Sequence, residues 1–92
     1  IKAAEEGHDV VMASTNAFYF DFYQGPREKE PLAIGGYLPL RKVYEYDIIP
    51  AKLAADKQHH ILGGQFQIWT EYIATPEKAE YMAFPRACAA AE

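Results

Sequence analysis

The segment 65–71 (QFQIWTE) alternates in the way a half-buried β-strand does, and this pattern constrains the fold more than any other part of the sequence. In an extended chain, Phe66 and Ile68 lie on one side. Trp69 and Glu71 lie on the other side, so the only tryptophan of the chain shares a face with a carboxylate. The segment therefore predicts a strand that presents an aromatic ring beside an acid near its end.

An aromatic ring beside an acid suits the recognition of a sugar. The ring face covers the C–H surface of a sugar ring, and the carboxylate accepts hydrogen bonds from paired hydroxyl groups. A lone tryptophan in a strand is, however, also a common core residue, and Glu71 is also typical of a solvated charge at a strand end. This segment alone leaves both interpretations open.

A second segment, 17–24 (AFYFDFYQ), repeats the arrangement, and five of its eight residues are aromatic. Its alternation predicts a strand with Tyr19 and Asp21 on one face and phenylalanines on the other. The spacing of this pair matches that of Trp69 and Glu71. Two such pairs in 92 residues favour a cleft that binds a polyol, and a strand with one apolar face against a core is the alternative.

The beginning of the chain predicts an αβ unit. Residues 1–6 show a helical pattern that Gly7 would end, because glycine favours the backbone conformation that terminates helices. The apolar run 10–14 follows, and it is typical of a strand buried on both faces, as in a parallel sheet.

The middle of the chain is mostly irregular. We expect an exposed loop at 25–31, a packed loop broken by glycines and proline at 32–40, and a short helix at 41–46. A further helix is predicted at 51–62, ending at Gly63.

Two helices are predicted at the end of the chain. Thr75 is a good N-cap residue, and Pro76 stands at the first helical position, where proline is favoured. The first helix, about 76–83, should end before Pro85, because proline cannot continue the backbone hydrogen bonding. A second helix is expected over 86–91.

Composition excludes several classes of function. The net charge of −4 and the lack of a basic run argue against nucleic-acid binding, and no apolar run is long enough to span a bilayer. The single cysteine, Cys88, excludes an internal disulfide and a cysteine-rich metal site. His59 and His60 are adjacent and diverge by about 100° on a helix, so they are not a metal-binding pair. We expect neither a metal nor a cofactor.

Much of the chain resembles one family of enzymes. The segments that carry the resemblance are GHDVVMAS (7–14), YFDFYQ (19–24), EPLAIGGYLPLRKVYEYD (30–47), HHILGGQFQIWTEYIATPEKAEYM (59–82) and FPRACAAAE (84–92). They resemble the C-terminal part of the family-20 glycoside hydrolases, the β-N-acetylhexosaminidases.

The resemblance implies an α/β fold, namely the last two strands and the closing helix of a TIM (β/α)8 barrel. Met12 would lie in the seventh strand and Gln67 in the eighth, joined by the long connection 22–62. Residues 1–92 would then form an incomplete catalytic domain, because such a barrel needs about 250 residues. This agrees with the ends of the sequence, which starts at Ile1 and stops within a helical pattern, so we expect a piece of a longer protein.

The resemblance also implies a chemistry. These enzymes remove terminal β-linked N-acetylglucosamine or N-acetylgalactosamine with retention, and the substrate's own acetamido group is the nucleophile. By resemblance, Tyr19 donates a hydrogen bond to the acetamido oxygen and is the catalytic residue in this chain. Asp21 and Glu71 match the acids that bind hydroxyl groups near C6 and C4, and Trp69 matches the tryptophan that walls the acetamido pocket.

The catalytic Asp-Glu pair of the family is absent, since the sequence contains no Asp-Glu dipeptide. The resemblance therefore implies an enzyme whose partners here are an amino-sugar glycoside and the remainder of the barrel, and this segment alone should be inactive. Its unpaired strand edges predict self-association. Family members are commonly periplasmic, secreted or lysosomal. A small non-catalytic carbohydrate-binding module, or a structural α/β module whose aromatic residues are all core, remains the alternative.

Overall fold

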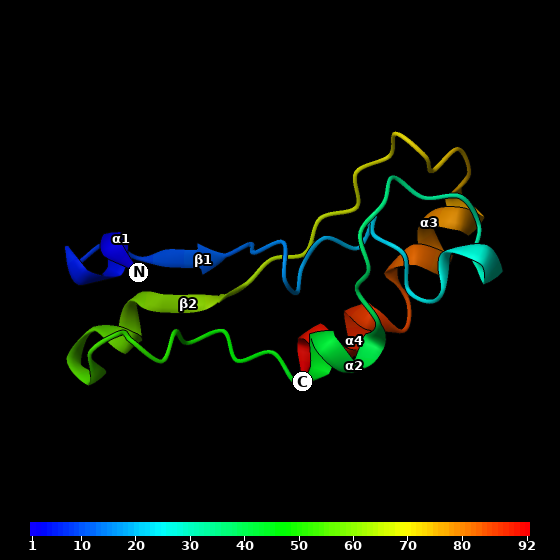
Figure 1. Ribbon diagram of the computed structural model, residues 1–92. Helices are drawn as coiled ribbons and strands as arrows, with labels where there is room; N and C mark the ends of the chain where they lie inside the picture. The colour runs from blue at the N-terminus through cyan, green and yellow to red at the C-terminus, as the bar shows by residue number, and fades with distance from the viewer. The chain divides into compact units, whose positions relative to one another are not determined.

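The computed structural model describes residues 1–92, which form two compact units. The first unit contains residues 1–12 and 47–65, and the second contains 13–46 and 66–92. Figure 1 follows the chain through the helices α1 (Lys2–Glu5), α2 (Leu40–Tyr44), α3 (Pro76–Ala83) and α4 (Arg86–Ala91), the 3-10 helices η1 (Arg27–Lys29) and η2 (Ala55–His60), and the strands β1 (Val10–Met12) and β2 (Ile61–Gly64). None of the helices has the length and apolar character needed to cross a bilayer.

The first unit is built on a parallel pair of strands. β1 and β2 lie side by side (Figure 1), with Val10 opposite Ile61 and Met12 opposite Gly64. The Gln65 amide then donates to the Met12 carbonyl at 2.8 Å and extends the pairing by one residue. Parallel strands need a long crossover connection, here residues 13–60, and the parallel pairing agrees with the parallel sheet that the run 10–14 predicted.

The start of the first unit confirms the prediction of a helix that ends at a glycine. α1 is followed by Gly7, whose φ of +90° is a conformation that glycine adopts without strain. The expectation that the next strand is buried on both faces is wrong, because Val11 is 52% exposed. A sheet of two strands leaves part of each strand uncovered.

The prediction of a helix over 51–62 followed by a strand over 65–71 is also wrong. Residues 55–60 form η2, and the strand is β2, which includes Gly63, the residue that was expected to end the helix. His60 Nδ1 lies 3.0 Å from Asp9 Oδ1, and this contact holds the start of β2 beside the residue that precedes β1. Pairing with β1 therefore decides where the strand lies, and local helical propensity does not.

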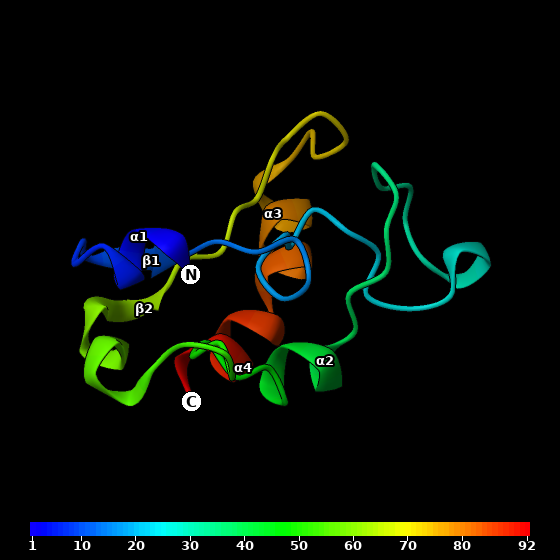
Figure 2. The same ribbon diagram turned by 60° about the vertical axis from the view of Figure 1, so that its left-hand side comes forward.

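The second unit contains α2, α3 and α4, and its core is mostly apolar, although Asp21 and Arg86 are also buried. Its central cluster is Phe20, Leu38 and Val43, against which Ile68 and the alanines of α4 pack. α2 and α4 lie side by side in both Figure 1 and Figure 2.

The strand predicted for 17–24 is reduced to a single parallel bridge between Tyr19 and Gln67, after which residues 20 and 21 form a turn and residue 22 a bend. Both sets of alternating side chains are largely buried, including Phe20 and Asp21. The Phe20 carbonyl accepts a hydrogen bond from the Arg86 side chain and not from a neighbouring strand, so a ladder does not continue past the bridge.

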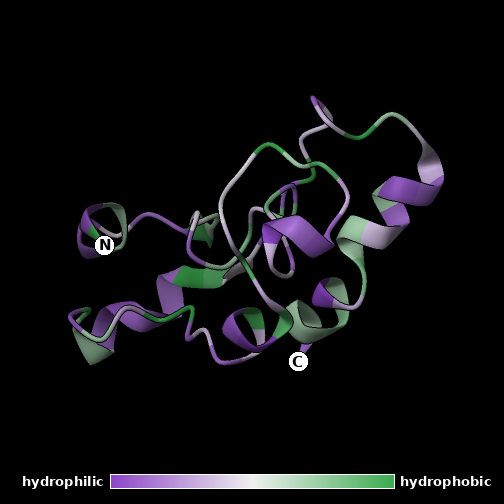
Figure 3. Ribbon diagram, turned by 45° about the vertical axis from the view of Figure 1, so that its right-hand side comes forward, coloured by the Kyte–Doolittle hydropathy of each residue, from purple (hydrophilic) through white to green (hydrophobic).

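The predicted helix boundaries at the end of the chain are confirmed. Thr75 Oγ1 accepts a hydrogen bond from the Lys78 amide at 3.1 Å, Pro76 is the first residue of α3, and α3 ends before Pro85. Figure 3 shows α3 largely purple and polar over its first turns, whereas α4 is mostly pale green and apolar.

The loops of the second unit also match the expectations. Segment 25–31 is exposed apart from the half-buried Gly25 and Glu30, and segment 32–40 is irregular but buries Ala33 and Leu38. Gly36 in this segment has a φ of +66°, and a Cβ placed on it would lie 2.5 Å from the ring of Phe22.

We expect Gly36→Ala to lower the free energy of unfolding by more than the ~1–2 kcal/mol that a positive φ alone costs an L-residue. The excess comes from the collision with Phe22, which follows Asp21 in the chain. Gly7→Ala is the matched control, because Gly7 also has a positive φ but has no atom within 4 Å of the added carbon. Denaturant unfolding of both variants checks this, and equal losses would contradict it.

Candidate functional site

The two aromatic–acid pairs start from adjacent backbones. The Phe20 amide donates to the Gln67 carbonyl at 2.8 Å, and the Gln67 amide donates to the Phe18 carbonyl at 2.7 Å. This is the parallel bridge that pairs Tyr19 with Gln67. Tyr19 and Asp21 therefore lie on one segment, and the paired segment leads to Trp69.

Asp21 is the most unusual polar residue of the second unit. Its side chain is 4% exposed, and Oδ1 has no hydrogen-bond partner. Burial is the main cause that raises the pKa of this carboxyl above the ordinary 3.8, and the negative charge of Glu71 raises it further. A hydrogen bond from the backbone amide of Asp21 and the positive charge of Arg86 both lower the pKa and oppose this rise. The surroundings of Asp21 thus disfavour its charged form, through burial first and the negative charge of Glu71 second.

Arg86, at the start of α4, is completely buried. Its guanidinium donates only to backbone carbonyls, and all five of its N–H groups are used. The bonds are Nε to Met82 at 3.1 Å, Nη1 to Phe22 at 3.0 Å and to Leu38 at 3.1 Å, and Nη2 to Met82 at 2.6 Å and to Phe20. Burial lowers the pKa of Arg86 to about 10, so the side chain stays positively charged at neutral pH.

The segment 65–71 keeps its two faces although it is not a regular strand. Phe66 stacks on Phe20, with ring centroids 4.6 Å apart and an interplanar angle of 13°. Ile68 packs against the central cluster. Trp69 and Glu71 are exposed, and the tryptophan is 53% accessible, so Trp69 is not a core residue of this unit. Tyr19 is half-buried, and its ring lies 5.6 Å from that of Phe22.

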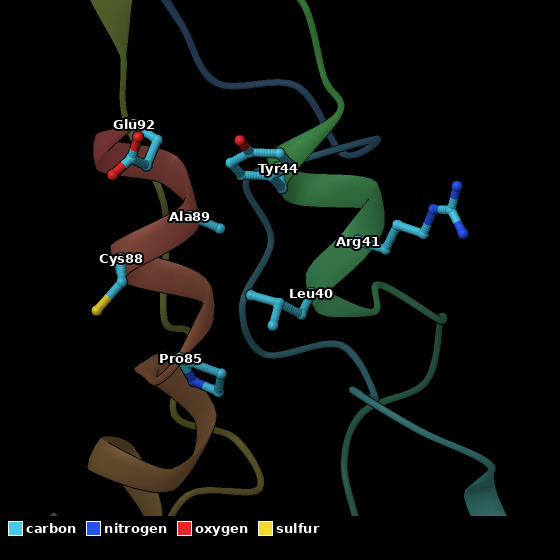
Figure 4. A pocket seen from close by; sticks show the side chains of 7 residues that line it. All are labelled: Leu40, Arg41, Tyr44, Pro85, Cys88, Ala89 and Glu92. Carbon is cyan, nitrogen blue, oxygen red and sulfur yellow. The ribbon is translucent and has the colours of Figure 1, made fainter.

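The second unit also has two cavities that the four predicted site residues do not line. One, about 460 Å³, lies between α2 and α4 (Figure 4). Leu40, Tyr44 and Ala89 lie between the two helices, whereas Arg41 and Cys88 point away from the gap. The other, about 410 Å³, is lined by Tyr23, Arg27, Glu30, Leu32, Ala33, Ile34 and Tyr72.

Arg86 is the residue that the sequence reasoning missed. It is the one charged residue in the run PRACAAA, and a lone arginine at the start of an alanine-rich helix was a signal that it could be buried and paired. Its acceptors are carbonyls from Phe20, Phe22, Leu38 and Met82, which no sequence pattern identifies in advance.

Comparisons with known proteins agree across the whole chain. Residues 1–92 match the Glycosyl hydrolase family 20, catalytic domain. A beta-hexosaminidase from Porphyromonas gingivalis is 47% identical over 93 residues, which cover 100% of this chain and 12% of that protein. A beta-hexosaminidase from Vibrio vulnificus is 34% identical, over 97% of this chain and 13% of its own length. The chain thus spans about an eighth of these relatives.

A solved structure gives the same result. The crystal structure of a family-20 exo-β-N-acetylglucosaminidase from Vibrio harveyi in complex with N-acetylglucosamine is 35% identical, with a TM-score of 0.79. The similarity covers 99% of this chain and 15% of that one.

The buried Asp21 makes a prediction about pH and stability. Because its pKa is higher in the folded than in the unfolded chain, the folded state binds the proton more tightly, and stability falls as the pH rises from 3.8 through the raised value. Asp21→Asn removes the ionised carboxylate, so we expect it to raise the free energy of unfolding at about pH 7. The gain should disappear below pH 3.8, where aspartate is neutral in both states.

Urea unfolding at the two pH values measures this difference. Asp56→Asn is the control, because the same change is made there at an exposed position of η2. If Asp21→Asn shows no gain over Asp56→Asn near neutral pH, the carboxyl of Asp21 is not destabilised by burial.

Proposed function

This chain belongs to glycosyl hydrolase family 20, and from this premise we propose that it supplies part of the sugar site of a β-N-acetylhexosaminidase. The fold is that of a portion of the family's TIM-barrel catalytic domain. The portion we propose is the C-terminal one, with residues 1–92 providing the last two strands and the closing helix. The parallel pairing of β1 with β2 supports this assignment, because neighbouring barrel strands are parallel and joined by long connections.

The observation that carries the proposal is the carboxylate of Asp21. A buried carboxylate oxygen without a donor is costly unless a partner is supplied from outside the chain. A sugar hydroxyl is such a donor, and the family resemblance assigns to Asp21 the hydroxyl near C6. The negative charge of Glu71 acts on the same carboxyl group, which suits a second acid that binds the hydroxyl near C4.

Tyr19 is then the residue that acts on the reacting group. In the proposed reaction, the acetamido oxygen of the substrate attacks the anomeric carbon as the glycosidic bond breaks, and the leaving-group oxygen takes a proton from the general acid. The oxazolinium intermediate that forms is then opened by water. The Tyr19 hydroxyl donates a hydrogen bond to that oxygen, which orients the nucleophile. The exposed ring of Trp69 walls the acetamido pocket and lies against the sugar.

The general acid must come from outside these residues. The family supplies it from an Asp-Glu pair, and this sequence contains no such dipeptide. The remainder of the barrel is therefore the partner that this segment requires. The substrate, by family membership, is a glycoside of N-acetylglucosamine or N-acetylgalactosamine. The exposed Val11 and Leu62 of the two strands support self-association of the segment when the rest is missing.

The first test concerns Trp69, the only tryptophan of the chain. We expect its fluorescence in the isolated segment not to change when N-acetylglucosamine is added at submillimolar concentration. The full-length protein should hydrolyse an aryl N-acetylglucosaminide. A submillimolar response from the segment alone would instead favour the alternative, a self-contained carbohydrate-binding module.

The second test concerns Tyr19. In the full-length protein, we expect Tyr19→Phe to lower kcat by about 10²–10³, the cost of one donor to a developing charge. Tyr44→Phe is the matched control, since Tyr44 is 63% exposed and lies on α2 beside the first cavity. Unchanged turnover of the aryl substrate by Tyr19→Phe would remove the role given to this hydroxyl.

A further inference from the structure

The guanidinium of Arg86 holds the backbone on both sides of Asp21. Nη2 donates to the carbonyl of Phe20, which directly precedes Asp21. Nη1 donates to the carbonyl of Phe22, which directly follows it, at 3.0 Å. A single rigid group thus binds the peptide unit that joins Phe20 to Asp21 and the one that joins Phe22 to Tyr23, and it restrains the backbone on both sides of Asp21.

The other bonds of the guanidinium anchor it to the rest of the second unit. Nε and Nη2 both donate to the Met82 carbonyl near the end of α3, at 3.1 and 2.6 Å. Nη1 also donates to the Leu38 carbonyl at 3.1 Å. The planar fork can reach acceptors in several directions at once, whereas a lysine ammonium has three donors at one point.

The ring of Phe20 links Arg86 indirectly to the segment that carries the second aromatic–acid pair. Its Cζ lies 4.9 Å from the centroid of the Phe20 ring. Phe66 stacks on Phe20 with a centroid distance of 4.6 Å, and Phe66 lies three residues before Trp69.

We propose that Arg86 is a positioning residue, which fixes the backbone of residues 20–22 so that the Asp21 carboxylate faces a sugar hydroxyl. This inference rests on the proposed function, and Arg86 itself touches no substrate. A buried arginine that donates to the carbonyls of Phe20 and Phe22 replaces the strand pairing that is missing after the Tyr19–Gln67 bridge.

The charge of Arg86 adds a second effect in the same direction. Burial and the nearby Glu71 both favour the neutral form of Asp21, and the positive charge of Arg86 opposes them. Glu30 and Tyr81 are the other titratable groups that act on Arg86. A cation at this position therefore helps to keep Asp21 ionised and able to accept from a hydroxyl.

The test compares two substrates in the full-length protein, an aryl N-acetylglucosaminide and its 6-deoxy analogue. We expect the wild-type protein to prefer the first by about 10-fold to 100-fold in kcat/KM, the range for one hydrogen bond to a charged group. Asp21→Asn should remove most of this preference. Arg86→Lys keeps the charge but loses the planar guanidinium with its five donors, so it should reduce the preference by about tenfold.

Two comparisons separate positioning from a general effect on folding. Arg41→Lys is the matched control, because the Arg41 side chain is 85% exposed, and it should keep the wild-type preference. In the double variant Arg86→Lys, Asp21→Asn, the two losses should not add, since Arg86 acts through Asp21.

If Arg86→Lys lowers the melting temperature but leaves the preference unchanged, Arg86 is only structural and the inference is overturned. If Arg86→Lys does not fold, Phe66→Leu replaces it, because Phe66 is 41% exposed and backs the ring on which the guanidinium lies. An unchanged preference in Phe66→Leu would then overturn the inference. Failure of the proposed function shows separately, as a wild-type protein that does not hydrolyse the aryl substrate, and the inference fails with it.

Discussion

The second unit depends on one buried cation. The Arg86 guanidinium joins carbonyls from three separate parts of the chain, namely the segment around Asp21, the loop before α2 and the end of α3. Burying a charge is costly unless its hydrogen bonds are complete, and here each N–H has an acceptor. The hydrogen bonds that offset the burial of the guanidinium are the same ones that hold the carbonyls of Phe20 and Phe22. Residues 20–22 therefore keep a defined backbone conformation although they are not part of a sheet.

The carboxyl of Asp21 is the opposite case. It is almost as deeply buried as Phe20, yet one of its oxygens has no donor within the chain. Native proteins leave few such groups unsatisfied, and the exceptions tend to mark places where a ligand or another part of the protein binds. Arg86, whose hydrogen bonds are complete, and Asp21, which has an oxygen without a donor, meet at the same stretch of backbone. A firmly fixed acceptor loses little conformational freedom when a hydroxyl arrives, and this favours selective binding.

Local signals in the sequence predicted the features that local physics determines. The cap at Thr75, the break before Pro85 and the glycine that ends α1 depend on residues a few positions apart, and all three are confirmed. The faces of 65–71 were also predicted, because Phe66 stacks on Phe20, Ile68 packs against the central cluster and Trp69 is exposed. The resemblance to the family required only the residues themselves.

The positions of the strands and the burial of Arg86 could not be predicted from local sequence patterns. β2 lies at 61–64 because β1 pairs with it there, and that partner is about fifty positions away. The strand expected at 17–24 fails because its carbonyls bind Arg86, which is more than sixty positions away. Both errors have one cause, since a pattern over eight residues contains no information about a distant partner.

The interleaving of the two units has a consequence for how the chain acquires its structure. The first unit combines residues 1–12 with 47–65, and the second combines 13–46 with 66–92. As the polypeptide leaves the ribosome, neither unit can be completed while its later half is still untranslated. Closing such large loops is entropically costly, so consolidation should come late during biosynthesis. Proteolytic cleavage between residues 46 and 47 would likewise separate the two segments from which each unit is built.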